Sequence, residues 1–127
     1  MSKEDLFARA DVLSVHLILS RRTRGLVGAA ELALMKPSAI LVNTSRGPIL
    51  DEGALLDVLR RKQIRCAAID VYDTEPLPAD HPFRTLDNVV PTPHLGYVTR
   101  EVYEVFYGDA VEDIAAFRAG NPIRVME

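Results

Sequence analysis

Three side chains stand just past apolar runs in the sequence, and together their types suit acid–base chemistry. Arg46, Glu75 and His94 each come a few residues after such a run. In an open parallel sheet the carboxyl ends of the strands converge on one crevice. We therefore expect a guanidinium, a carboxylate and an imidazole to meet at one edge of a sheet, where they form a usable catalytic set.

The composition is that of an ordinary globular protein. The 127 residues include 48% hydrophobic and 26% charged residues, which argues against a disordered, collagen-like or membrane-spanning chain. The length fits one compact domain, and the formal net charge of -3 argues against a nucleic-acid partner. Cys66 is the single cysteine, and no apolar run is long enough for a signal peptide or a membrane span. We therefore expect a cytoplasmic protein without a membrane partner.

Apolar periodicity predicts that strands and helices alternate along the chain. The expected strands cover residues 12–19, 39–43 and 66–71, with a fourth beginning at 88, and the expected helices cover residues 2–9, 29–35, 52–62 and 99–119. This alternation predicts right-handed parallel crossovers in a three-layer α/β sandwich. The first strand is apolar on both faces, so we expect it inside a covered sheet.

A signature of dinucleotide binding is missing from the sequence. No G-x-G-x-x-G occurs, and Gly25-Leu26-Val27-Gly28 has the wrong spacing and context to hold a pyrophosphate. The sequence therefore predicts that half of a dinucleotide fold is absent.

Some polar residues outside the catalytic set receive structural interpretations. Asp51 is placed to cap the helix that follows it. We expect His16 in the core, because it lies within an apolar strand, and His81 in an exposed loop. That loop, between residues 71 and 88, is rich in proline and carries Glu75, and long loops of this kind are usually functional or disordered.

Several motifs together resemble the D-isomer-specific 2-hydroxyacid dehydrogenases, whose best-known members are phosphoglycerate dehydrogenase-like enzymes. The motifs are residues 11–17, 34–47, 51–52, 69–76 and 92–96. They occur in the family's order, and the resemblance covers residues 5–125. It implies that residues 1–127 are part of an NAD-binding domain, a Rossmann-type parallel sheet of about four strands that forms the second half of the dinucleotide-binding fold. The family's Gly-rich turn, ribose-binding acidic residue and substrate domain would precede Met1.

The resemblance also implies a role for each residue of the catalytic set. Arg46, in Asn43-Thr44-Ser45-Arg46-Gly47, matches the arginine that grips the substrate carboxylate and carbonyl, a task that suits a planar guanidinium. His94 matches the acid–base residue, which donates a proton to the carbonyl oxygen as hydride arrives from the nicotinamide. Glu75 matches the carboxylate that pairs with this histidine and fixes its tautomer. The substrate would be a small 2-hydroxy or 2-oxo acid.

The resemblance further implies an NAD site, with NADP left open because the discriminating ribose contact would lie before Met1. The cofactor-binding residues it implies are Thr44, Ser45, Arg46, Asp70, His94, Gly96 and Tyr97. The chain departs from the family's pattern at Asp73, an extra acid beside Glu75, and at Leu17-Ile18, where a proline is commoner.

Three other interpretations of the sequence compete with this one. A hydrolase triad of Ser45, His94 and Asp70 lacks a G-x-S-x-G elbow. A metal site lacks ligand spacing. The serious alternative is a non-catalytic half-fold that associates with itself, through an unpaired sheet edge at residues 12–19 or through the C-terminal helix.

Overall fold

The computed structural model describes residues 1–126 and divides the chain into two compact units. The first unit is Met1–Leu95, and the second begins at Gly96. All of the residues of the catalytic set belong to the first unit.

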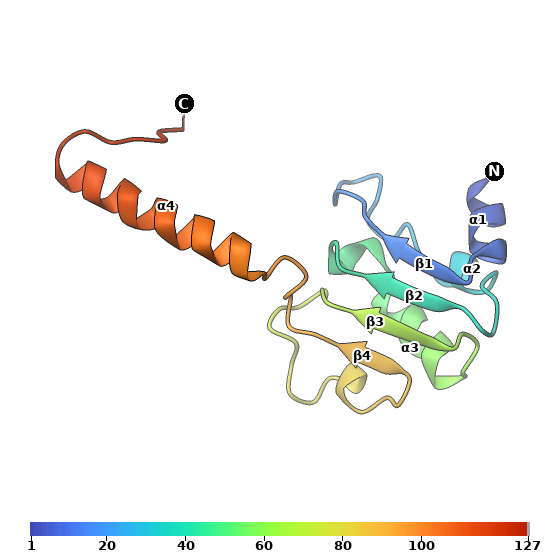
Figure 1. The fold of residues 1–127 in the computed structure, drawn as a ribbon. Coiled ribbons are helices and arrows are strands. Elements are labelled where there is room, and N and C mark those ends of the chain that lie inside the picture. The colour runs from blue at the N-terminus through green and yellow to red at the C-terminus, as the bar shows by residue number, and fades with distance from the viewer. Residues whose placement is uncertain (127) are drawn as a thin grey trace. The chain divides into compact units, whose positions relative to one another are not determined.

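A four-stranded parallel sheet forms the centre of the first unit (Figure 1). Its strands are β1 (Val12–Val15), β2 (Ile40–Asn43), β3 (Cys66–Ile69) and β4 (Val89–Pro91), in the order β1-β2-β3-β4. Each neighbouring pair is parallel, which confirms the predicted sheet. β1 is shorter than predicted because Val15 pairs with Asn43, the last residue of β2, so the chain beyond it has no strand to follow.

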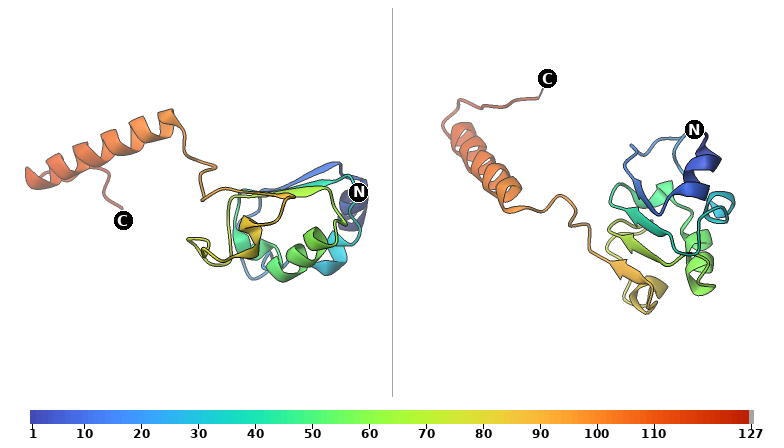
Figure 2. Two further views of the ribbon diagram at one scale, coloured as in Figure 1. Left: turned by 90° about the horizontal axis from the view of Figure 1, so that it is seen from below. Right: turned by 45° about the vertical axis from the view of Figure 1, so that its right-hand side comes forward.

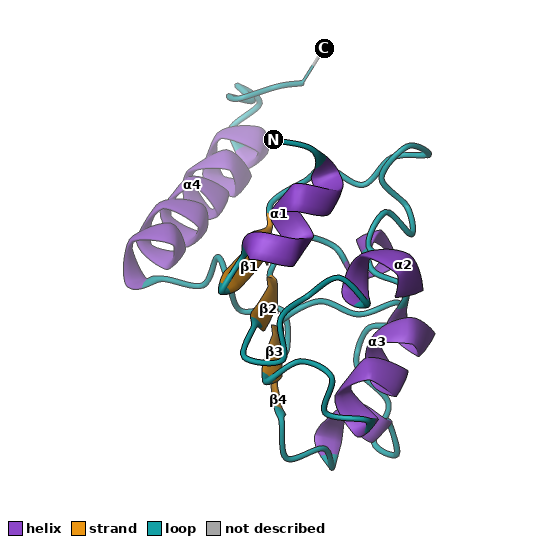
Figure 3. Ribbon diagram, turned by 90° about the vertical axis from the view of Figure 1, so that its right-hand side faces the viewer, coloured by secondary structure: helices purple, strands orange, loops and turns teal. Residues whose placement is uncertain are grey.

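Three α-helices and two 3-10 turns complete this unit. They are α1 (Lys3–Arg9), α2 (Ala29–Leu32), η1 (Gly47–Ile49), α3 (Glu52–Arg60) and η2 (Pro82–Arg84). The Ala54 N–H donates to Oδ1 of Asp51 at 3.0 Å, so Asp51 caps α3 as predicted. α2 and α3 lie on one face of the sheet (Figures 2 and 3).

The core lies between the sheet and these helices. Alternate strand residues are buried there, because successive side chains of a strand point to opposite faces, and they pack with the apolar stripe of α3. The residues of the core include Leu13, Leu41, Ala67 and Ile69 from the strands and Leu55, Val58 and Leu59 from α3. Burial of each large side chain contributes about 1.5–3 kcal/mol.

The opposite face of the sheet is not covered by the elements of the first unit, which supply two of the three predicted layers. Val12 is 61% exposed and Val90 is 60% exposed, whereas the residues between them on β2 and β3 are half-buried. The expectation that β1 is buried on both faces is therefore wrong within this unit. His16, just past β1, is exposed rather than in the core, and its Nε2 lies 2.8 Å from Oγ of Ser14.

The second unit contains α4 (Arg100–Arg118), which begins and ends within one residue of the predicted helix 99–119. The Val102 N–H donates to Oγ1 of Thr99 at 3.2 Å and so caps the helix. None of its residues is buried within the unit. Within residues 1–126, no helix has both the length and the apolar character needed to cross a membrane.

Candidate active site

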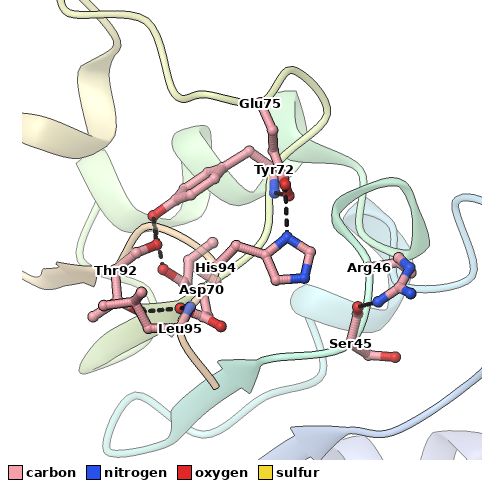
Figure 4. A network of polar contacts seen from close by, with 9 residues as sticks. Ser45, Arg46, Asp70, Tyr72, Glu75, Thr92, His94 and Leu95 are labelled. Atoms are coloured by element: carbon pink, nitrogen blue, oxygen red, sulfur yellow. Dashed lines mark hydrogen bonds and ion pairs between the residues drawn. The ribbon is translucent and has the colours of Figure 1, made fainter. Parts of the chain in front are cut away.

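The register of the sheet aligns the carboxyl ends of three strands. Asn43 pairs with Ile69, and Ile69 pairs with Pro91, so β2, β3 and β4 end level with one another. Arg46 follows β2 by three residues and His94 follows β4 by three. This shared edge also receives the loop that leaves β3 and carries Glu75 (Figure 4).

His94 and Glu75 form a direct pair at this edge. Nδ1 of His94 lies 2.6 Å from Oε2 of Glu75, and the two side chains are 36% and 35% exposed. A carboxylate only accepts hydrogen bonds, so Nδ1 carries the proton of this bond in both the neutral and the charged ring. The second oxygen of Glu75 accepts from the Tyr72 N–H at 3.0 Å.

The surroundings of Glu75 favour its ionised form. Partial desolvation by itself would raise the pKa of Glu75, but the hydrogen bonds from His94 and the Tyr72 N–H, with the positive charges of His94 and Arg46, outweigh it. The pKa of Glu75 is therefore below its ordinary value.

The backbone of His94 is held in an uncommon conformation by Asp70. His94 has φ of 59°, in the left-handed region. Asp70 is buried, with 4% of its surface exposed. Its Oδ1 accepts hydrogen bonds from Oγ1 of Thr92 at 2.5 Å and from the Leu95 N–H at 2.8 Å. These bonds flank His94 on both sides and fix the turn that presents its ring.

Asn43 shapes the turn that carries Arg46. Its side chain, 1% exposed, donates to the Arg46 carbonyl at 3.0 Å and accepts from the Ser45 N–H at 3.0 Å. Nη1 of Arg46 donates to the Ser45 carbonyl at 2.6 Å. The guanidinium is exposed at the sheet edge, where an anionic ligand can reach it.

A cavity of about 500 Å³ opens beside the His94–Glu75 pair. It is lined by Tyr72, Glu75, Pro76, Leu77, Arg84, Pro91, Thr92, Pro93 and His94. Both members of the acid–base pair therefore border a space of the size that holds a small ligand.

The sequence profile of the D-isomer specific 2-hydroxyacid dehydrogenase NAD binding domain matches residues 1–96. The chain belongs to this family.

Individual members of the family extend the match over nearly the whole chain. Glyoxylate reductase of Aeropyrum pernix is 48% identical over 120 residues, which are 94% of this chain and 36% of that protein. The structure of phosphoglycerate oxidoreductase from Vibrio cholerae matches with a TM-score of 0.84 and 44% identity, over 94% of this chain and 38% of that one. A D-isomer specific 2-hydroxyacid dehydrogenase from Xanthobacter autotrophicus, in complex with NADPH and MES, matches with a TM-score of 0.74 and 36% identity, over 95% of this chain and 49% of that one.

These matches confirm the resemblance to the family and the Rossmann-type fold of the chain. The chain spans 36% of the length of the Aeropyrum relative. The family is that of the NAD(P)-dependent 2-hydroxyacid dehydrogenases, and the chain belongs to its NAD-binding domain.

The predicted cofactor-binding residues of this chain lie in both units. Thr44 and Ser45 follow β2 at the carboxyl edge, with Thr44 exposed and Oγ of Ser45 donating to the Leu17 carbonyl at 2.5 Å. Asp70 directly follows β3. Gly96 and Tyr97 belong to the second unit, and Tyr97 is 57% exposed there.

The contacts of the same residues argue against a hydrolase triad. Glu75, not Asp70, is the carboxylate on Nδ1 of His94, and Ser45 is bonded to Leu17. Within residues 1–126, no group of three or more His, Cys, Asp and Glu side chains is placed to hold a metal ion.

Sequence reasoning missed several residues that shape the site. Asn43 and Gly47 belong to the motif that carries Arg46, but neither of them is predicted from the sequence to have a role in the site. His81 was expected in an exposed loop, but its side chain is 14% exposed and pairs with Glu52. The approach of Gly47 to Tyr72 and the bond of His81 to Glu52 each join residues more than 20 positions apart, so no local pattern signals them.

Proposed function

We propose that residues 1–127 act as part of the NAD-binding domain of a dehydrogenase that transfers hydride between a nicotinamide cofactor and a small 2-hydroxy or 2-oxo acid. The observation that supports this most strongly is the His94–Glu75 pair, 2.6 Å apart at the carboxyl edge of the sheet, to which Arg46 also belongs because it follows the end of β2. Glyoxylate reductase among the relatives favours a small 2-oxo acid such as glyoxylate.

His94 is the proton donor in this proposal. Because Nδ1 is engaged by Glu75, Nε2 is the atom that exchanges a proton with the substrate. In the reducing direction Nε2 gives its proton to the carbonyl oxygen of the 2-oxo acid, and in the oxidising direction it takes the hydroxyl proton. The Glu75 carboxylate stabilises the positive charge of the ring before the transfer and holds its orientation.

Arg46 binds the substrate in this proposal. Its guanidinium presents paired N–H donors that match a carboxylate in a bidentate way. The present bond from Nη1 to the Ser45 carbonyl uses one of its five donors. Arg46 thereby orients the acid by its carboxylate.

The residues at the carboxyl edge fit the nicotinamide end of a dinucleotide. The hydroxyls of Thr44 and Ser45 and the carboxylate of Asp70 are hydrogen-bonding groups of the kind a carboxamide requires. The nicotinamide supplies or accepts the hydride. NAD is the cofactor expected from the family, and NADP remains an alternative because a related structure holds NADPH.

A chimera tests this function directly. Residues 1–127 replace the matching segment of the Aeropyrum glyoxylate reductase, and reduction of glyoxylate is followed by oxidation of NADH. We expect activity that falls about 10²–10⁴-fold in His94→Gln, the range for loss of a general acid, and that falls strongly in Arg46→Ala. Arg65→Ala is the control, since Arg65 is exposed at the opposite, amino-terminal end of β3. Activity that survives His94→Gln contradicts the proposal.

The second candidate is a non-catalytic module that associates with itself, and the exposed edge and open face of β1 favour it. A titration of the chain alone with NADH, followed by fluorescence, separates the two. Saturable binding that weakens in Asp70→Ala supports the dehydrogenase domain, whereas absence of both binding and chimera activity supports the module.

The half-buried Cys66 is the single cysteine, which suits a reducing compartment such as the cytoplasm.

A further inference from the structure

A second pair of side chains holds the loop that carries Glu75. Nε2 of His81 lies 2.9 Å from Oε1 of Glu52, and these side chains are 14% and 23% exposed. The Asp73 N–H donates a longer bond, 3.5 Å, to Oε2 of the same carboxylate. Glu52 therefore contacts the loop on both sides of Glu75.

The second bond of His81 settles which ring nitrogen donates. Nδ1 accepts from the Phe83 N–H at 3.2 Å and so caps η2. Nε2 of the neutral ring therefore carries the proton and donates it to Glu52. The ring centroids of His81 and Phe83 are 4.9 Å apart, and Phe83 is 1% exposed. His81 thus joins the loop to the core and to α3 at once.

Between its two contacts with Glu52 the loop is also held by Arg84, which ends η2 and donates to the carbonyls of Leu77 and Pro78 at 2.7 and 2.8 Å, and by Leu77, which packs against the core. No residue from 73 to 80 is buried. Each ordered residue of such a segment costs conformational entropy, so fixing the two ends limits the positions that Glu75 can reach.

Glu52 itself is fixed with respect to the sheet. It is the first residue of α3, next to the cap that Asp51 provides. The chain reaches it from Arg46 through η1. Glu52 therefore links the segment that carries Arg46 to the loop that carries Glu75.

We infer that His81 is a positioning residue that acts through Glu52 to hold the loop so that Glu75 meets His94. This inference rests on the proposed function, in which that pair is the acid–base unit.

Two substitutions of His81 separate its contacts. In His81→Asn, the amide oxygen stands near the place of Nδ1 and keeps the cap on η2, but the side chain is too short to reach Glu52. In His81→Gln, the amide nitrogen stands near the place of Nε2 and keeps the bond to Glu52. Both variants lose the ring contact with Phe83, so His81→Gln is the matched control for that loss.

The first measurement uses the chain itself and needs no activity. Nuclear magnetic resonance with ¹⁵N-labelled histidine detects the Nδ1 proton of His94, which the bond to Glu75 protects from exchange with water. We expect this signal in the wild type and in His81→Gln, and its loss by exchange in His81→Asn and in Glu52→Ala. An undiminished signal in a folded His81→Asn overturns the inference. If His81→Asn does not fold, an undiminished signal of the His94 Nδ1 proton in Glu52→Ala overturns the inference instead.

The second measurement uses the glyoxylate reductase chimera. We expect kcat to fall about ten- to a hundredfold in His81→Asn, with KM for glyoxylate nearly unchanged because Arg46 is untouched, and to recover in His81→Gln. A purely structural role of His81 predicts equal losses in both variants, and that result overturns the inference. An inactive wild-type chimera counts against the proposed function, while the exchange of the His94 proton still decides the role of His81.

Discussion

At the scale of single residues, the site depends on polar side chains that hold unusual backbone. His94 has φ of 59°, a region that costs a non-glycine residue roughly 1–2 kcal/mol. Asp70 offsets that cost by accepting bonds from residues 92 and 95. The buried amide of Asn43 does the same for the turn before Arg46. The reactive groups are therefore placed by neighbours that do no chemistry.

The lowered pKa of Glu75 predicts a pH dependence of stability. A carboxyl whose pKa is lower in the folded chain contributes stability above its unfolded pKa, about 4.3, and that contribution is lost as the pH falls through the folded value. Glu75→Gln removes the contribution. We expect the difference in Tm between wild type and Glu75→Gln to be full at about pH 5 and above, and to shrink below about pH 4. Thermal unfolding followed by circular dichroism checks this, and a difference that is constant across this range refutes it.

At the scale of elements, a close backbone contact joins the segment after β2 to the segment after β3. A Cβ atom at Gly47 would lie 2.1 Å from the carbonyl carbon of Tyr72 and 2.7 Å from the nitrogen of Asp73. Only a glycine allows this approach. The approach brings the chain beside Arg46 against the start of the loop that carries Glu75.

The contact at Gly47 predicts that even a methyl group is not tolerated there. Gly47→Ala must push the two segments apart, so we expect a loss of about 1–3 kcal/mol or more in the free energy of unfolding. Gly53→Ala is the matched control, because its Cβ would meet Oδ1 of Asp51 at an ordinary 3.5 Å and alanine favours the helix by up to about 1 kcal/mol. Urea denaturation of both variants is the measurement. Equal stability of the two would show that the approach is not tight.

At the scale of the whole molecule, the first unit leaves sheet surface unpaired. β1 and β4 are the two edge strands of the described sheet. The outer edge of β1 presents N–H and C=O groups next to the exposed Val12. Such an edge favours pairing with another chain.

This edge predicts that the chain associates with itself. We expect sedimentation velocity to show species larger than a monomer, in proportions that rise with concentration. Val12→Lys should reduce association, because a charge on an edge strand opposes pairing. Asp57→Lys, which places a lysine at an exposed position of α3, should leave association unchanged. A single monomer at every concentration would contradict this prediction.

The order and type of the elements were accessible from the sequence. Apolar runs, capping residues such as Asp51, and glycine or proline breaks act over a few neighbouring positions, so they can be interpreted without the fold. Alternation of strands and helices then leads to a parallel sheet, and the position of Arg46 and His94 past strand ends follows from it. The family resemblance came from the same local motifs.

Tertiary structure alone decided which residues meet. The bond between His81 and Glu52 spans 29 positions, and Gly47 contacts a backbone 25 positions away. The exposure of His16 and the short length of β1 depend on where β2 ends and on what covers the sheet. Long-range contacts of this kind leave no periodic pattern in the sequence, because they are set by how the elements pack and not by their local conformation.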